Sequence, residues 1–89
     1  GLIRLEIDGE IYDYKLYNTL KSLSKTYSQR KSAKELGISH AVLNRRIKKA
    51  EDKLGLRIVE KIGSGSVLTI EGINLLKEYE NYYHQIAKT

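Results

Sequence analysis

Residues 28–55 read SQRKSAKELGISHAVLNRRIKKAEDKLG, and this stretch decides the fold of the chain. Gly37 separates two segments whose apolar residues recur at helical spacing, and glycine readily adopts the positive φ found where a helix ends. Ser39 follows as a suitable N-cap for the second segment, and Gly55 ends it. The stretch therefore predicts a helix-turn-helix over about residues 28–54, with helices from about Gln29 to Leu36 and from Ser39 to about Leu54.

The second of these helices carries two chemically different faces. Its apolar stripe, which should face the core, consists of Leu43, Ile47, Ala50 and Leu54. On the opposite face lie polar and basic side chains, and these suit base edges because arginine pairs with guanine, asparagine pairs with adenine, and an alanine methyl packs on a thymine methyl. The first turns of such a helix meet the bases in a helix-turn-helix protein. We therefore predict base contacts from His40, Ala41, Asn44 and Arg45.

Phosphate contacts are expected on either side of this base-reading face. Backbone amides and polar side chains at the start of a helix favour a phosphate there, and basic side chains at the edge of the groove do the same. The predicted phosphate contacts are Ser28, Gln29, Arg30, Lys31, Ser39, Arg46, Lys48 and Lys49. Lys61, Ser64, Gly65 and Ser66 could add contacts from a hairpin that follows the helix-turn-helix.

The residues before this stretch predict a β ribbon and a first helix. Apolar alternation over Leu2 to Ile7 runs into Asp8-Gly9, a pair that favours a tight hairpin turn, so a ribbon is expected over about residues 2–12. Asp13 is a suitable N-cap for a helix that runs through about Ser24. The apolar face of that helix is formed by Leu16, Leu20 and Leu23.

The residues after Gly55 predict a wing and a last helix. A strand from Arg57 to Ile62, a flexible tip over residues 63–66 and a returning strand at Val67-Leu68 would form a wing over about residues 57–68. Thr69 is a suitable cap for a helix from about Ile70 to Lys88. The predicted fold is one mainly α domain over residues 1–89, a winged helix-turn-helix with an N-terminal β ribbon and a long C-terminal dimerisation helix.

The charge of the chain is concentrated in one block. Net charge is +5, and residues 30–61 hold ten Lys or Arg against four acidic residues, whereas the remainder is close to neutral. Such a block favours a polyanion partner because each neutralised phosphate releases counterions. A solvated face of a basic protein is the alternative explanation of the charge alone.

Composition excludes several other classes of protein. The chain has no Cys, so it holds no disulfide, thiolate zinc site or cysteine nucleophile. His40 and His84 have no carboxylate pair beside them, and no nucleophile has a base at a suggestive spacing, so we expect no enzyme, metal or cofactor. No apolar run approaches the length of a membrane helix, so a cytoplasmic, nucleoid-associated protein without a membrane is expected. Gly1 stands where an initiator Met would be expected, so an effector domain outside this chain is possible.

The last helix carries an apolar stripe that suggests a homodimer. Leu76, Tyr79, Tyr83 and Ile86 fall at the spacing of a coiled-coil seam, and Tyr82 broadens it. Three tyrosines exceed what so small a core requires, and tyrosine is common at interfaces. We predict these five residues as the dimer interface; packing of the whole stripe within one chain is the alternative.

From Ser28 to Leu76 the sequence resembles the DNA-binding domain of LysR-type regulators. The residues that carry the resemblance are Ala33, Leu36-Gly37-Ile38-Ser39, Leu43, Arg45, Ile47, Glu51, Leu54-Gly55, Leu68-Thr69, Gly72 and Leu75-Leu76. The β ribbon and the tyrosine-bearing last helix are similar to the N-terminal domain of ModE-type molybdate-responsive repressors. Two departures from the LysR pattern, Ala50 for Leu and Val59 for Phe, imply a smaller local core.

The resemblance implies a winged-helix dimer that recognises an inverted-repeat operator in double-stranded DNA and regulates transcription. No effector can be assigned, because the effector-binding domain of both families is absent from this chain. An architectural protein that binds DNA with little sequence preference is the main alternative, favoured by small size and basicity. A protein-docking module is the third. Asn44 and Arg45 favour the sequence-specific regulator, because a protein that binds only the backbone needs Lys and Arg alone.

Overall fold

The computed structural model describes the chain from residue 14 to residue 88, and its side chains to residue 85. Its elements are α2 (Tyr14–Thr26), α3 (Gln29–Leu36), α4 (His40–Leu54), β1 (Val59–Ile62), β2 (Gly65–Leu68) and α5 (Ile70–Lys88). This order matches the predicted winged helix-turn-helix. The predicted β ribbon over residues 2–12 and the Asp13 cap lie outside the described residues.

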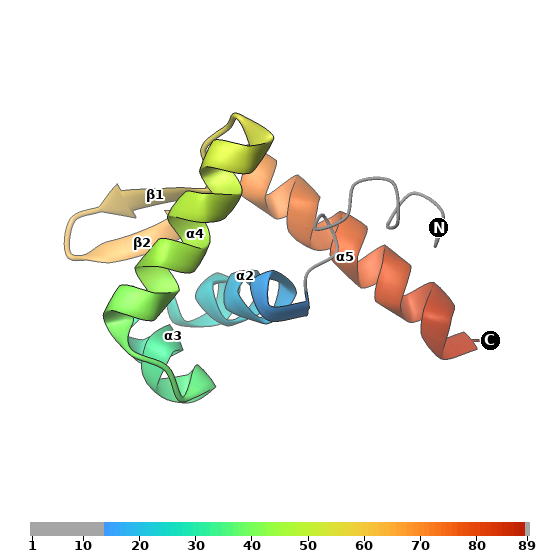
Figure 1. The fold of residues 1–89 in the computed structure, drawn as a ribbon, viewed down its shortest axis with the longest axis horizontal. Coiled ribbons are helices and arrows are strands. Elements are labelled where there is room, and N and C mark those ends of the chain that lie inside the picture. Colours follow the sequence, from blue (N-terminus) through green and yellow to red (C-terminus); the bar gives the residue numbers. More distant parts are fainter. Residues whose placement is uncertain (1–13, 89) are drawn as a thin grey trace.

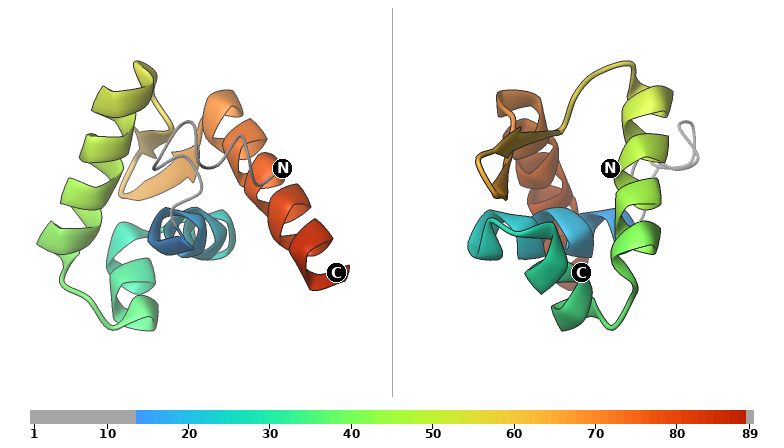
Figure 2. Two further views of the ribbon diagram at one scale, coloured as in Figure 1. Left: turned by 45° about the vertical axis from the view of Figure 1, so that its right-hand side comes forward. Right: turned by 90° about the vertical axis from the view of Figure 1, so that its left-hand side faces the viewer.

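Helix α2 is the centre of the domain. It contacts α3, α4, α5 and β2, and it lies between α4 and α5 in the left view of Figure 2. Leu16, Leu20 and Leu23 are buried, as the apolar spacing predicted, together with Leu43 of α4 and Tyr79 of α5. The core of the described residues therefore forms around α2, and it fixes the orientation of the other helices.

The ends of the helices are set by serine, threonine and glycine at the expected positions. The hydroxyls of Ser28, Ser39 and Thr69 accept hydrogen bonds from the amides of Lys31, Val42 and Gly72. Gly37 adopts a φ of 70° and Gly55 one of 69°, and both lie immediately after a helix, where this left-handed conformation leaves a side chain strained. The turn between α3 and α4 and the end of α4 are therefore fixed locally.

The wing is a two-stranded antiparallel hairpin in which Val59 pairs with Leu68 and Ile62 with Gly65. Figure 1 shows it projecting past α4, on the side away from the C-terminal end of α5. Strand β2 begins at Gly65, two residues earlier than the sequence predicted, so the tip is shorter. The physical reason is that the Ser66 amide donates to the Tyr27 carbonyl at 2.9 Å, which draws this end of the strand against the turn before α3.

Candidate nucleic-acid interface

Helix α4 separates its apolar and polar faces as its sequence predicted. Leu43 and Ile47 are buried in the core, and Ala50 and Leu54 are half-buried beside them. On the far side, the predicted base-contacting residues are on the surface: His40, Ala41 and Arg45 are exposed and Asn44 is half-buried. Lys48 and Lys49 are exposed on the same helix. The structure therefore presents this polar face to solvent on a helix that is anchored along its other side.

The start of α3 presents some of the predicted phosphate contacts. Arg30 and Lys31 are exposed, whereas the side chain of Gln29 is buried and its Nε2 donates to Ser66 Oγ at 3.1 Å. The Ser28 hydroxyl is occupied as the N-cap of the helix. Basic side chains at this end of α3 thus remain on the surface, while Gln29 is directed into the domain.

Two of the residues predicted to contact DNA, Gln29 and Ser66, are buried and connect parts of the domain. Ser66 is buried, its hydroxyl accepts from Gln29, and its amide donates to the Tyr27 carbonyl. These interactions join the wing to the start of α3, so the predicted phosphate contacts of the Gln29 side chain and the Ser66 amide do not fit this arrangement. Lys61 and Ser64 remain exposed on the wing.

The junction between the wing and α3 is unusually close. A Cβ atom on Gly65 would lie 2.8 Å from the Tyr27 carbonyl oxygen, so no larger residue fits without a shift of the backbone. Tyr27 itself adopts a φ of 55°, a left-handed conformation that is uncommon for residues other than glycine. The sequence gives no sign of this contact, because its partners are 38 residues apart in the chain.

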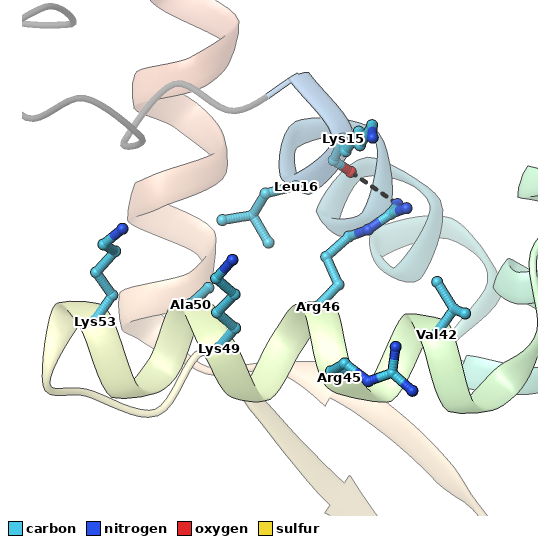
Figure 3. A pocket seen from close by; sticks show the side chains of 8 residues that line it. All are labelled: Lys15, Leu16, Val42, Arg45, Arg46, Lys49, Ala50 and Lys53. Atoms are coloured by element: carbon cyan, nitrogen blue, oxygen red, sulfur yellow. Dashed lines mark hydrogen bonds between the residues drawn. The ribbon is translucent and has the colours of Figure 1, made fainter.

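Arg46 connects α4 to α2. Its guanidinium donates to the Lys15 carbonyl at 3.3 Å and to Thr19 Oγ1 at 3.0 Å. Arg46, which the sequence predicted as a phosphate contact, therefore holds the middle of α4 against α2 (Figure 3). Ser39, also predicted to contact phosphate, is exposed and caps α4.

Glu51 has a different partner from the one that its neighbours in the helix suggest. An ion pair with Lys48 or Arg45 of the same basic helix is the expectation from the sequence, but Glu51 Oε2 accepts hydrogen bonds from the amides of Ile58 and Val59 at 2.9 and 3.2 Å. The Arg57 guanidinium lies 3.7 Å from the same oxygen. One carboxylate thus fixes the path of the chain from α4 into the wing.

The predicted dimer seam lies largely inside the domain. Leu76, Tyr79 and Tyr82 are buried in the chain's own core, and Tyr79 stacks against Tyr83 with ring centroids 6.5 Å apart. Tyr83 is half-buried, and the side chain of Ile86 is outside the described part of the chain. The apolar stripe of α5 was therefore correctly located, but most of it covers α2 of the same chain.

The described residues hold no group of three His, Cys, Asp or Glu side chains that could bind a metal ion. Within the same residues, no helix is long and apolar enough to span a membrane.

Residues 14–73 match the model of a protein family that is described as "Bacterial regulatory helix-turn-helix protein, lysR family". An uncharacterized HTH-type transcriptional regulator of Methanocaldococcus jannaschii is 32% identical over 80 residues, which make up 90% of this chain and 29% of that protein. The HTH-type transcriptional activator AmpR of Yersinia enterocolitica is 35% identical over 69 residues, 78% of this chain and 24% of AmpR. The chain thus spans less than a third of the length of these relatives.

The fold has close structural counterparts as well. The crystal structure of the CbnR DBD–DNA complex is similar to this chain with a TM-score of 0.75 and 18% identity, over 85% of this chain and 87% of that one. The predicted winged-helix fold and the resemblance to LysR-type regulators are both confirmed. The β ribbon on which the ModE-type resemblance partly rests is outside the described residues.

Proposed function

The chain belongs to the LysR family of bacterial regulatory helix-turn-helix proteins, and on that premise we propose that it binds double-stranded DNA at specific sites and regulates transcription. The observation that carries this proposal is the outer face of α4. His40, Ala41 and Arg45 are exposed, and Asn44 is half-buried beside them. A polar helix face held rigidly away from the core is suited to enter the major groove.

The four residues would read bases, each through a different chemical property. Arg45 offers paired donors to guanine, Asn44 a donor and an acceptor to adenine, and Ala41 a methyl group to thymine. His40, in the first turn, is placed to reach a base edge or its sugar. Arg30 and Lys31 at the start of α3 would hold a phosphate, and Ser39, Arg46, Lys48 and Lys49 would hold others beside α4.

We propose that two copies of the chain bind one inverted repeat. Because Leu76 and Tyr79 are buried within one chain, the contact between copies must use the part of α5 that the core leaves open. Ile73 is 41% exposed, and Tyr83 is half-buried at the other end of the same helix. These residues, with the predicted Ile86, form our proposed dimer surface.

The function proposed for this chain is regulatory rather than catalytic, and chromosomal DNA as its ligand would place it in the cytoplasm.

An architectural role with little sequence preference is the second candidate. Four basic side chains on α4 are exposed and a fifth, Arg46, is half-buried, which favours this role in part because backbone contacts carry no sequence information; the exposed ones are Arg45, Lys48, Lys49 and Lys53.

Replacing Arg45 by alanine distinguishes the two roles. For a sequence-specific regulator we expect Arg45→Ala to weaken binding to the preferred duplex by about 1–3 kcal/mol and to relax the preference at one base pair. The measurement is fluorescence anisotropy with the preferred duplex and with duplexes altered at single positions.

Lys77→Ala is the matched control, because Lys77 is an exposed basic residue on α5 and not on α4. It should leave the preference among duplexes unchanged. An equal loss on every duplex from Arg45→Ala would support the architectural role, and no effect on any duplex would contradict both.

A further inference from the structure

The wing meets the turn before α3 at a junction that contains several unfavourable local features. Tyr27, in that turn, adopts a φ of 55°, a conformation that costs free energy for any residue with a side chain. Gln29 is only 8% exposed, and its Oε1 is buried without a hydrogen-bond partner among the described residues. Gly65 leaves no room for a Cβ atom against the Tyr27 carbonyl. Because such features concentrate where function requires them, this junction is a candidate for a functional role.

Two hydrogen bonds hold the wing at the junction. The Ser66 amide donates to the Tyr27 carbonyl at 2.9 Å, and the buried Gln29 donates from Nε2 to Ser66 Oγ at 3.1 Å. Both views of Figure 2 show the wing beside this end of α3. One residue of the wing, Ser66, is therefore held through its backbone and through its side chain at the same time.

The turn that carries the Tyr27 carbonyl is itself fixed. The Ser28 amide donates to Thr26 Oγ1 at 3.2 Å, so the residues on either side of Tyr27 are joined to each other. The same threonine hydroxyl lies 2.8 Å from the hydroxyl of Ser32, which is fully buried in α3. The wing is therefore attached to a part of the domain whose position the core determines.

The strand register places a basic residue opposite Ser66. Lys61 pairs with Ser66 across the hairpin, and residues opposite each other in an antiparallel pair have their side chains on the same face of the sheet. Lys61 is exposed and therefore lies on the face of the wing that is turned toward α3, where Arg30 and Lys31 are exposed as well. The position of Lys61 relative to these two cations thus depends on the bond between Gln29 and Ser66.

We propose that Gln29 is a positioning residue for DNA binding, which holds the wing where Lys61 reaches the backbone of the duplex that α4 reads. The inference rests on the proposed function and deepens it, because it assigns a role to a buried residue that touches no DNA. A buried leucine would fill similar space without a polar atom to satisfy. Glutamine instead selects one arrangement of the wing, since its amide has a partner only when Ser66 lies within reach.

The test compares the effect of Lys61→Gln in the 89-residue chain with its effect in a Gln29→Leu background. Anisotropy with the preferred duplex at a series of salt concentrations measures both. In the otherwise unchanged chain, loss of one phosphate contact should lower the slope of log affinity against log salt by about 0.9 in magnitude. In the Gln29→Leu background the wing is no longer held in position, so Lys61→Gln should change the slope little.

Ser22→Ala is the matched control, because it removes a buried hydroxyl whose partners, Ser32 and Glu35, belong to α3 and not to the wing. A general loss of stability would leave the contact of Lys61 in place, so Lys61→Gln should keep its full effect on the slope in this background. Urea unfolding checks that each variant is folded under the conditions of the titration. Ser66→Ala breaks the same bond from the wing side and takes the place of Gln29→Leu if that variant unfolds.

An equal effect of Lys61→Gln in the unchanged chain and in the Gln29→Leu background would overturn the inference. So would a Lys61→Gln variant with the wild-type slope, or an effect that is reduced just as much by Ser22→Ala. In each of these cases, specific binding by the wild-type chain would still support the proposed function. A wild-type chain that binds no duplex would instead refute the proposed function, and the inference with it.

Discussion

Glu51 illustrates how much of this domain depends on single side chains that join distant segments. Its carboxylate is the acceptor for two consecutive amides, those of Ile58 and Val59, and its side chain is only 11% exposed. Hydrogen bonds to a charged acceptor are stronger than neutral ones, and a buried amide without a partner is costly. Glu51 therefore holds the wing in its position relative to α4.

Replacing Glu51 by glutamine should lower the free energy of unfolding by about 1–3 kcal/mol, because the neutral amide provides a single weaker acceptor for two donors. Urea unfolding followed by circular dichroism measures the change. Asp52→Asn, on an exposed neighbour in the same helix, should change stability by less than about 0.5 kcal/mol. Equal stability of the two variants would show that Glu51 contributes nothing to the junction.

The partner of Glu51 marks one limit of prediction from the sequence at the scale of residues. Spacing within a helix indicates neighbours three or four positions away, and for Glu51 the basic residue at that spacing is Lys48. The actual partners are backbone amides that follow a turn after Gly55. Every residue type except proline has a backbone amide, so the pattern of side chains in the sequence does not indicate which amide will donate. The same reason hides the contact of Tyr27 with the wing, whereas Gln29 and Ser66 join through their side chains but are 37 residues apart in the chain.

At the scale of elements, α5 approaches the segment before β1 through a glycine. A Cβ atom on Gly72 would overlap the carbonyl oxygen of Ile58 and lie 3.3 Å from Leu68 Cβ. The Ile58 carbonyl also accepts from the Thr69 amide at 3.0 Å, so it cannot move freely. The packing of α5 beside the wing thus requires glycine at this position.

Gly72→Ala should lower the free energy of unfolding by about 1–3 kcal/mol or more. The energetic cost of the overlap exceeds the roughly 1 kcal/mol by which alanine is favoured over glycine within a helix. Asn74→Ala, at an exposed position of the same helix, should be neutral or slightly stabilising. Thermal unfolding of both variants measures the difference. A Gly72→Ala variant as stable as Asn74→Ala would mean that α5 does not pack as described.

The elements themselves could be predicted well, because their ends are determined by local chemistry. Serine and threonine caps and the glycines after α3 and α4 lie where the sequence placed them. Strand β2 began earlier than expected, since its start depends on the tertiary contact between Ser66 and Tyr27. On α5, apolar spacing located the buried stripe correctly, but spacing alone does not reveal whether the same chain or a second copy covers it.

At the scale of the whole molecule, the proposed dimer depends on the surface of α5 that remains open. Ile73→Asp places a charge on that surface at a residue that is 41% exposed, so it should weaken association with little effect on folding. Gln85→Asp adds the same charge at an exposed position near the end of α5 and is the control.

Analytical ultracentrifugation measures both variants with and without the preferred duplex. We expect the dissociation constant of the dimer to rise at least tenfold for Ile73→Asp, equivalent to about 1.4 kcal/mol, and to stay unchanged for Gln85→Asp. An unchanged dimer in Ile73→Asp would move the interface away from this part of α5.

The central claim is that this chain recognises a particular DNA sequence as a pair of copies. Selection from a random duplex library, followed by anisotropy titration of the enriched duplex and of a scrambled one, tests it most directly. We predict an inverted repeat whose half-sites are about one duplex turn apart, on the order of 34 Å, bound far more tightly than the scrambled duplex. No enrichment, with equal and steeply salt-dependent binding to every duplex, would contradict the claim.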